Sequence, residues 1–534
     1  MSAKSTESSA RLSPATAGVA DRARFQSSTH ETELKFLLSE TDFKAVQQSA
    51  LLGAAEQSSD PQRLHSIYFD TDAGDLRRHR TVLRIRRLRD SNVLTLKWPG
   101  SSEGGTFERG EIEVPTDLSV PDPTLLGEDV AAEITRLTEG RPLHVHFATD
   151  IKRVVRRVVA GASEIEAAFD TGFIVCGDQK TPVRELELEL KTGDPTDLYR
   201  FGLALTQNYP VRLGILTKAE RGTMLSSSEH ASAVRARSPD LLDQTVDQAI
   251  GTIINACLGQ FIANWPAFEG PDRTESVHQM RVAMRRLRAM LALFHHRFPC
   301  SEFKNIRAEA KRIASAMGDA RNWDVFGTMM REGPNGALPF EPGFEPLMAA
   351  AEDRRQMGYD KVAELLGHVE TTRFVLSVQA FVSRRGWRNA LSGTELPRLT
   401  EPVADFATSC LERLHRQVCK RGKKLIDLPA EERHEVRIAL KNLRYAAESF
   451  GNLFDHTGAI RSYTHAAARL QDTLGRFNDM VMINDLVGQL DTHADNSARA
   501  AGIIIGWYGR GVLEGDDALL DAWKLFRKAQ PFWT

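Results

Sequence analysis

Apolar and polar residues alternate with a period of two in short runs up to about residue 230. In a β-strand the side chains at positions i, i+2 and i+4 lie on one face, so each run predicts a strand with two unlike faces. Segments rich in Gly, Asp, Ser and Pro separate the runs and predict turns. The clearest alternating runs are 31–36, 82–86, 93–97, 111–114 and 185–190. Many short strands separated by turns predict an all-β barrel or sandwich with a few helices.

Beyond about residue 240 the apolar residues recur at helical spacing instead. Helices are predicted at 241–265, 274–297, 301–317, 344–366, 402–424, 430–450, 459–475, 479–490 and 515–528. The Ser-rich segment before them predicts a linker between two domains. We therefore divide the chain into a disordered tail (1–29), a β domain (30–225), a linker (226–240) and a helical domain (241–534).

The helical half contains an internal repeat. Residues 277–288 (VHQMRVAMRRLR) resemble residues 433–444 (RHEVRIALKNLR). The equivalent pairs are His278 and His434, Arg281 and Arg437, Arg285 and Lys441, and Arg288 and Arg444. The segment 313–318 matches 470–475 at the same separation of 156–157 residues. Repetition at one separation predicts a duplicated helical bundle with pseudo-twofold symmetry, with repeats at about 241–390 and 400–534.

The composition is that of an ordinary globular protein: 42% of the residues are hydrophobic, 26% are charged and the net charge is -2. So small a net charge does not by itself predict a nucleic-acid or membrane partner. The five cysteines form no C-x-x-C pair, which is typical of a reducing compartment. No apolar run approaches the roughly 20 residues of a membrane span, and the N-terminal segment lacks the apolar core of a signal peptide. We therefore expect a cytoplasmic protein without a membrane partner.

Charged residues of both signs share strand faces in the β half. The shared-face sets are Glu31, Glu33 and Lys35; Arg84 and Arg86; Thr95 and Lys97; Arg109, Glu111 and Glu113; Glu164 and Glu166; and Glu185, Glu187 and Glu189. An ordinary barrel would expose these faces to water and bury the alternating Leu, Ile and Val residues. Repeated Glu pairs beside Arg pairs on so many strands favour a charged interior instead. Clustered carboxylates suit Mg²⁺ or Mn²⁺, and Arg and Lys suit phosphate oxygens, so the pattern indicates phosphoanhydride hydrolysis.

The β half resembles the CYTH family of triphosphate tunnel metalloenzymes over about residues 30–225. The family signature E-x-E-x-K corresponds to residues 31–35, Y-[YF]-D-T to 68–71 and L-R-x-R to 83–86. The segments 94–97, 109–113, 187–189 and 217–221 follow in the family's order. The resemblance implies an antiparallel eight-stranded tunnel, or barrel, closed around a triphosphate. Substrates within the family are inorganic tripolyphosphate, thiamine triphosphate, RNA 5′-triphosphate and ATP, which some members cyclise.

The resemblance also implies roles for individual residues. Glu31, Glu33 and Lys35 of the signature form the implied catalytic group. The implied metal ligands are Glu31, Glu33, Glu111, Glu113, Glu187 and Glu189. The implied phosphate-binding residues are Lys35, Arg84, Arg86, Lys97, Arg153 and Lys218. The sequence contains no obvious base-binding element, which favours inorganic tripolyphosphate as the substrate.

Cationic stripes run along the helices of the other half. At about 100° per residue, positions at offsets of 0, 3, 7 and 10 fall on one side of a helix. This spacing occurs in three sets: His278, Arg281, Arg285 and Arg288; His434, Arg437, Lys441 and Arg444; and Arg413, Arg416, Lys420 and Lys423. A shorter stripe is formed by Lys304, Arg307 and Lys311. Solvated helix faces usually pair Glu with Lys at i, i+4, and we expect these stripes to lack such acidic partners, which favours a polyanionic ligand.

The make-up of the stripes favours inorganic polyphosphate over nucleic acid as that ligand. Proteins that bind single strands interleave aromatic residues that stack on bases. The stripes themselves contain no aromatic residue. Phe294 and Tyr445 lie at neighbouring positions, outside the stripes. A ligand with phosphates and no bases therefore fits better, and salt is expected to weaken its binding strongly.

The helical half resembles a CHAD domain over about residues 240–530. The motif H-x-x-R-[VI]-x-x-[RK]-x-x-R occurs at 278–288 and 434–444, and a glycine-containing element follows at 317–322 and 474–479. This resemblance implies binding of inorganic polyphosphate. Together the halves resemble bacterial CYTH-CHAD inorganic triphosphatase-like proteins, and polyphosphate granules are a candidate location. Two alternatives stay open: a non-catalytic polyphosphate-binding protein, and a triphosphatase or cyclase that acts on thiamine triphosphate, RNA 5′-triphosphate or ATP.

Overall fold

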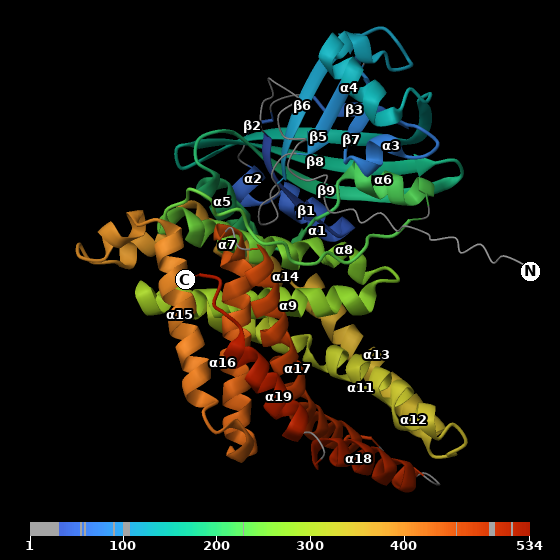
Figure 1. Cartoon of the computed structure of the whole chain (residues 1–534). Helices are drawn as coiled ribbons and strands as arrows, with labels where there is room; N and C mark the ends of the chain where they lie inside the picture. The colour runs from blue at the N-terminus through green and yellow to red at the C-terminus, as the bar shows by residue number, and fades with distance from the viewer. Residues whose placement is uncertain are drawn as a thin grey trace, which may run out of the picture.

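The protein consists of a β-sheet part followed by an all-helical part (Figure 1). The computed structural model describes residues 31–53, 56–57, 60–88, 91–99, 107–227, 229–454, 457–490, 497–513 and 516–533. The predicted tail, 1–29, lies outside these residues. Within them, the division into an antiparallel β part and a helical part confirms the predicted fold class.

Ten strands of the described chain form one antiparallel sheet in the order β10-β1-β6-β5-β4-β3-β7-β8-β9, with β2 paired to β7. Their bounds are β1 Glu31–Leu37, β2 Glu56–Gln57, β3 Gln62–Asp70, β4 Val82–Arg87, β5 Asn92–Pro99, β6 Phe107–Thr116, β7 His144–Ala160, β8 Ser163–Cys176, β9 Gln179–Thr192 and β10 Arg212–Leu213. Strand β1 pairs with β6 and also with β9, so the sheet curves into a tunnel. The two-residue strands β2 and β10 are additions to the predicted eight, because alternation cannot be read from two residues.

The two faces of the tunnel strands are chemically opposite. In β1, Leu34 and Phe36 are buried on the outer face, whereas Glu33 and Lys35 line the interior. The helices of this part are α1 Glu40–Gln47, α2 Ala50–Gly53, α3 Asp75–Arg78, α4 Glu128–Thr138, α5 Pro195–Asn208 and α6 Lys218–Ser227. Helix α5 packs on the outer face of β1, and Gly202 lets its backbone approach both Leu34 and Phe36. Helices outside the tunnel thus bury the apolar faces, and the charged faces lie inside.

The helical part contains long helices joined by short connections. Their bounds are α7 Val246–Ala263, α8 Trp265–Phe268, α9 Arg273–Arg297, α10 Ser301–Ala316, α11 Gly318–Glu332, α12 Pro334–Ala337, α13 Phe344–Gly367, α14 Val369–Ser383, α15 Val403–Arg421, α16 Ala430–Phe450, α17 Thr457–Val487, α18 Ser497–Leu513 and α19 Asp516–Lys528. Helices α11, α14 and α18, and the four-residue helix α12, have no counterpart among the predicted ones. Among the described residues, no helix combines the length and the apolar character needed to cross a bilayer.

Helix α17 corrects one prediction. Separate helices predicted at 459–475 and 479–490 form one continuous helix, with Gly475 in its interior. A glycine inside a helix costs about 1 kcal/mol relative to alanine. The buried residues Leu470, Leu474 and Ile483 anchor the helix on both sides of this point, and their packing outweighs that cost. The equivalent position in the first repeat does break, since α10 ends at Ala316 and α11 begins at Gly318.

Reciprocal contacts relate the two repeats of the helical part. The backbone N–H of Val246 donates to the carbonyl of Glu401 at 3.0 Å, and that of Val403 donates to the carbonyl of Gln244 at 3.0 Å. Each bond thus joins the start of α7 to the start of α15. Helix α9 packs against α16, α11 against α17 and α13 against α18, so equivalent helices meet in pairs. This arrangement is the pseudo-twofold symmetry that the sequence repeat predicts.

The two parts share a core at their junction. Helix α5 lies along α14, and buried residues from both parts form one continuous hydrophobic cluster. The segment between the parts is also held in place. The side chain of Asn264 accepts from the backbone N–H of Val234 and donates to the carbonyl of Val234, each at 2.9 Å.

Candidate functional site

The interior of the tunnel is a cavity of about 250 Å³ lined mainly by charged side chains. Its charged lining consists of Glu33, Lys35, Arg84, Arg86, Lys97, Glu111, Glu113, Arg153, Glu166, Asp170, Glu187, Glu189 and Lys218. All the side chains predicted for the tunnel site line this cavity, with one exception. The exception is Glu31, whose backbone lies in β1 but whose side chain is outside the described part of the chain.

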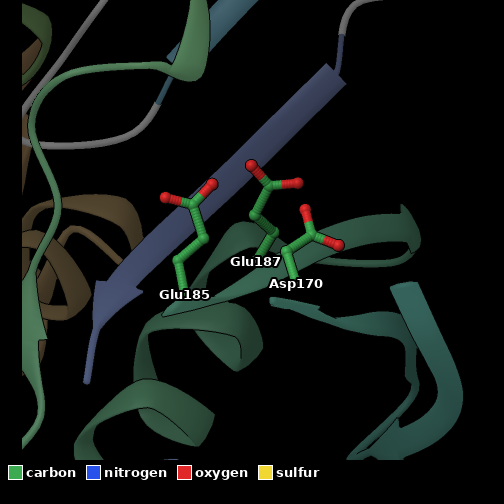
Figure 2. A group of neighbouring side chains, drawn as sticks. All are labelled: Asp170, Glu185 and Glu187. Atoms are coloured by element: carbon green, nitrogen blue, oxygen red, sulfur yellow. The ribbon is translucent and has the colours of Figure 1, made fainter. Parts of the chain in front are cut away.

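Three carboxylates form the most compact acidic group of the tunnel: Asp170 on β8 and Glu185 and Glu187 on β9 (Figure 2). One oxygen from each lies within 4.8 Å of the others. Asp170 and Glu185 are fully buried and sit opposite each other in the β8–β9 register. Of these three residues, only Glu187 is among those predicted to act in the tunnel site. Glu185 belongs to the alternating run 185–190. Asp170 does not stand out in the same way, because Ala168 interrupts the series of charged residues that begins with Glu164 and Glu166.

Cations already neutralise this acidic group. The Nζ atom of Lys218 lies 2.7 Å from Oδ2 of Asp170 and 2.8 Å from Oε1 of Glu187, and it also contacts Glu185. Arg153 pairs with Asp170 at 2.6 Å and with Glu187 at 2.5 Å. Arg221, which also lacked an assigned role, pairs with Glu185 at 2.6 Å. Two predicted phosphate-binding residues are therefore held in place by carboxylates.

The pKa values of this network reflect close pairing. Burial alone would lower the pKa of Lys218, but Asp170, Glu185 and Glu187 together raise it. Burial would likewise raise the pKa of Glu187, but Lys218, Lys35 and Arg153 hold it well below its usual range. The charged forms of Lys218 and Glu187 are thus stabilised by their partners, and both groups stay ionised at neutral pH.

Glu33 is in a different electrostatic situation. Burial, followed by the nearby carboxylate of Glu187, raises the pKa of Glu33 despite the opposing effect of Lys35, Lys97 and Lys218. In the β1–β9 register Glu33 lies directly opposite Glu189. Like charges directly opposite each other destabilise a strand pair. A divalent cation bound by carboxylate oxygens would relieve this repulsion, so the donor set at Glu33 and Glu189 fits Mg²⁺ or Mn²⁺.

The opposite wall of the tunnel carries the other predicted cations. Arg84 lies 3.5 Å from carboxylate oxygens of both Glu111 and Glu113, and Lys97 lies 2.9 Å from Glu111. The guanidinium of Arg84, burial and Arg153 lower the pKa of Arg86 to about 10. Positive charge is thus in excess around Arg86, which favours an anion at this end of the cavity.

A second concentration of charge lies where α9, α10 and α16 meet. Arg281 donates to the carbonyls of Met317 at 3.0 Å and Gly318 at 2.8 Å. Burial, Arg285 and Arg321 lower the pKa of Arg281 to about 10. Burial, with Arg437, Arg285 and Arg281 after it, lowers the pKa of Lys441 to about 8. We call Arg281, Arg285, Arg288, Arg307, Arg437 and Lys441 the helical cation cluster.

Two expectations about the stripes were wrong. Acidic partners at i, i+4 do occur, since Arg416 pairs with Glu412 at 3.1 Å and Arg444 with Glu448 at 3.2 Å. Tyr445 is also not outside the cation cluster, because its hydroxyl accepts a hydrogen bond from Nε of Arg285 at 3.0 Å. Helical spacing could not show this, because Arg285 and Tyr445 lie on different helices.

The two predicted histidines are not equivalent in their surroundings. His278 is half-buried, and burial and Arg321 lower its pKa to about 4. His434 is exposed. The second repeat also contains Asp479, whose pKa is raised by burial and lowered in part by Arg437 and Lys441. The first repeat has Asn322 at that position and carries its acidic residue at Asp319 instead, where the second repeat has Arg476.

The remaining predicted cations are distributed more widely. Lys304 and Lys311 on α10 are exposed, while Arg307 on the same helix is half-buried and close enough to Arg288 to lower its pKa. On α15 and just beyond it, Arg416, Lys420 and Lys423 are exposed and Arg413 is half-buried beside Cys410. The structure therefore brings together the stripes of α9, α10 and α16, whereas the α15 stripe has neighbours of its own.

The chain is similar to several known proteins. An inorganic triphosphatase from Haemophilus influenzae is 31% identical over 167 residues, which are 31% of this chain and 47% of that protein, or about half its length. An uncharacterized protein of Mycobacterium tuberculosis is 25% identical over 470 residues, covering 85% of this chain and 87% of that protein. The crystal structure of the CHAD domain from the plant Ricinus communis aligns at 27% identity with a TM-score of 0.47, covering 57% of this chain and 97% of that chain.

Two family models match along the chain. The CYTH domain model matches residues 29–223, which form the tunnel. The CHAD domain model matches residues 252–488, which include the helical cation cluster. The chain therefore contains a CYTH domain followed by a CHAD domain.

Proposed function

We propose that the protein is a divalent-metal-dependent hydrolase of inorganic triphosphate whose CHAD domain binds inorganic polyphosphate. The observation that carries the enzymatic part is the tunnel cavity, whose lining supplies carboxylates for a metal and Arg and Lys for phosphates. The CYTH domain and the similarity to an inorganic triphosphatase support the same reaction.

The lining of the cavity favours an inorganic substrate over a nucleotide. A base would need an apolar or aromatic surface on which to stack. Tyr68 is the aromatic residue among the described lining residues, and its ring is already stacked on Phe147 at a centroid distance of 4.4 Å. Its hydroxyl faces Arg84 and thus adds to the polar lining. Thiamine triphosphate, RNA 5′-triphosphate and ATP are therefore the alternatives to be tested against tripolyphosphate.

In the proposed reaction, water adds to a terminal phosphorus atom and the bond from that phosphorus to the bridging oxygen breaks, giving orthophosphate and pyrophosphate. The phosphate oxygens are bound by Lys35, Arg84, Arg86, Lys97, Arg153 and Lys218, which neutralise the charge that develops on the leaving pyrophosphate. A divalent ion would be held by Glu31, Glu33, Glu111, Glu113, Glu187 and Glu189. When bound, it supplies charge neutralisation and a more acidic water. Lys35 is buried and lies 3.4 Å from Glu187, which directs its ammonium group into the cavity.

The experiment that tests this proposal is phosphate release from tripolyphosphate with Mg²⁺ or Mn²⁺. Wild type is compared with Glu31→Ala/Glu33→Ala and with Glu40→Ala, which removes an exposed glutamate of α1. We expect release by wild type and Glu40→Ala and its loss in the double variant. No release by wild type with either metal would exclude the tripolyphosphatase and leave an organic triphosphate or a binding role.

The helical cation cluster is the basis for the polyphosphate-binding part. Burial and, after it, repulsion from neighbouring cations lower the pKa values of Arg281 and Lys441, and a polyanion would relieve that repulsion. Short RNA is the competing ligand. We expect long-chain polyphosphate to displace a fluorescent polyphosphate probe far better than single-stranded RNA of equal charge. Equal displacement by the RNA would favour a nucleic-acid-binding role.

A further inference from the structure

We infer that helix α14 of the CHAD domain is a positioning element for the lysines of the tunnel, acting through a hydrogen bond from Leu213 to Thr372. The inference rests on the proposed function for its catalytic consequence. Its structural basis is independent of that function. A helical bundle that binds a polyanion does not need, for that role, to contact the site of a neighbouring hydrolase domain.

The first contact joins strand β10 to helix α14. The backbone N–H of Leu213, in β10, donates to Oγ1 of Thr372 at 3.1 Å. Thr372 is fully buried and Leu213 is 2% exposed, so water cannot replace this hydroxyl. Strand β10 pairs with β1, where Leu213 is opposite Phe36. A side chain of the CHAD domain thus fixes the edge of the tunnel strand that carries Lys35.

The next residue along the chain touches Lys35 directly. The backbone N–H of Gly214 donates to the carbonyl of Lys35 at 2.7 Å. A Cβ at Gly214 would lie 2.9 Å from Cγ of Lys35, so the glycine backbone packs against the aliphatic part of the lysine side chain. The position of Gly214 therefore restricts the direction in which Lys35 enters the cavity.

The same segment ends at Lys218. Thr217 precedes α6 and exchanges hydrogen bonds with Glu220: its hydroxyl accepts from the Glu220 backbone at 3.2 Å, and its backbone donates to the Glu220 carboxylate at 2.8 Å. This capping box makes the start of α6 rigid. Lys218 is the first residue of α6, and its ammonium reaches the carboxylates of β8 and β9. Hydrogen bonds thus hold Leu213, Gly214 and Thr217 in the segment that leads from the contact with Thr372 to Lys218.

Helix α5, which leads into this segment, is fastened to α14 at both ends. Near its start, the hydroxyl of Thr196 donates to that of Ser383 at 3.0 Å. Near its end, the guanidinium of Arg373 donates to the carbonyl of Thr206 at 2.6 Å. A cation at a helix C-terminus also stabilises the helix dipole. The two helices run antiparallel, and α14 therefore fixes α5 and β10 as one unit.

The sequence provides a matched pair of substitutions on adjacent buried threonines. Thr371 is as buried as Thr372, but its hydroxyl donates to the carbonyl of Leu365 within the CHAD domain, at 2.6 Å. Thr372→Val removes the bond to the tunnel, Thr371→Val removes one internal to the helices, and Thr372→Ser keeps the hydroxyl. All three are made in the full chain.

Two measurements test the inference: steady-state hydrolysis of tripolyphosphate, and hydrogen exchange of the segment 211–218. We expect Thr372→Val to lower kcat/KM about tenfold, because small displacements of positioning groups have large effects on rate. Exchange of 211–218 should rise in this variant. Thr371→Val should keep both properties within about twofold of wild type at a similar loss of thermal stability, and Thr372→Ser should restore them.

The outcomes separate this inference from the proposed function. An active wild type with equal kcat/KM in both valine variants would overturn the positioning role and leave the hydrolase intact. An inactive wild type would refute the hydrolase. In that case hydrogen exchange alone would test the positioning role. Unchanged exchange of residues 211–218 in Thr372→Val would then refute that role as well.

Discussion

The tunnel and the helical cation cluster both concentrate Arg and Lys, but they compensate that charge in opposite ways. In the tunnel, Lys218 is surrounded by three carboxylates, which raise its pKa. In the cluster, burial and, after it, the neighbouring Arg437 and Arg285 lower the pKa of Lys441 to about 8. A site with balanced charge favours a cation and an anion bound together, whereas a site with excess positive charge needs only the anion. The contrast supports the proposal of metal-dependent hydrolysis in one domain and metal-independent binding in the other.

The largest expected effect is that of metal removal. Chelation with EDTA should reduce tripolyphosphate hydrolysis at least about 100-fold, because carboxylates such as Glu33 and Glu189 cannot themselves neutralise a triphosphate. Binding of polyphosphate by the cation cluster should not change. The check is phosphate release and fluorescent-probe binding in the same samples with and without EDTA. If polyphosphate binding also collapsed with EDTA, the two sites would not differ as described.

Removing one lysine from each site should change stability in opposite directions. Lys218→Met leaves three buried carboxylates with fewer partners and should cost roughly 3–5 kcal/mol of unfolding free energy. Lys441→Met removes a cation from a crowded group and should stabilise the free protein by about 0.5–1 kcal/mol. Thermal and urea unfolding measure both. Equal destabilisation by the two substitutions would mean that the positive charge of the cation cluster is balanced by negative charge, as it is in the tunnel.

Arg285 is a shared neighbour within the cation cluster: besides burial, it contributes to the lowered pKa values of Arg281, Arg288 and Lys441, and it donates to Tyr445. Arg285→Gln should weaken polyphosphate binding about tenfold, the usual size of a lost charged hydrogen bond, without changing KM for tripolyphosphate. Arg312→Gln is the control, because Arg312 is exposed on α10 and paired with Glu309 at 2.8 Å. Equal losses in the two variants would indicate binding by diffuse charge alone.

The smallest expected effect concerns pH. Because Lys441 has a pKa of about 8 in the free protein, it loses its proton as the pH rises through that value. A polyanion binds the protonated form better, so polyphosphate affinity should fall between pH 7 and pH 9, by about threefold to tenfold. Lys441→Arg keeps its charge and should flatten this profile. Titration of wild type and variant in parallel checks the expectation, and identical profiles would assign the pH dependence to another group.

Alternation along single strands was enough to predict which tunnel side chains share a face. Glu33 and Lys35 alternate with Leu34 and Phe36, and the structure has each pair on the expected side. Asp170 could not be predicted this way, because Ala168 stands where the charged alternation should continue. Its place in the network depends on the β8–β9 register opposite Glu185 and on the reach of Lys218 from α6.

In the helical part the sequence repeat predicted the symmetry but not the contacts between helices. Spacing along α9 and α16 identified Arg281, Arg285 and Lys441 on their own helices. It could not show that Tyr445 reaches Arg285, because that distance is set by how α9 packs on α16. The continuity of α17 also depends on packing between helices, because the packing on both sides of Gly475 outweighs the weak helix propensity of that one residue.

The sequence by itself therefore determined the two folds, the repeat and the chemical type of each charged surface, because period and residue type are local properties of the chain. Only the tertiary structure decided which charges are paired. Ion pairing depends on distances of a few ångströms between residues far apart in the chain, such as Lys218 and Asp170. The contact of Thr372 with the tunnel edge is of the same kind, because it exists only where two independently predictable domains meet.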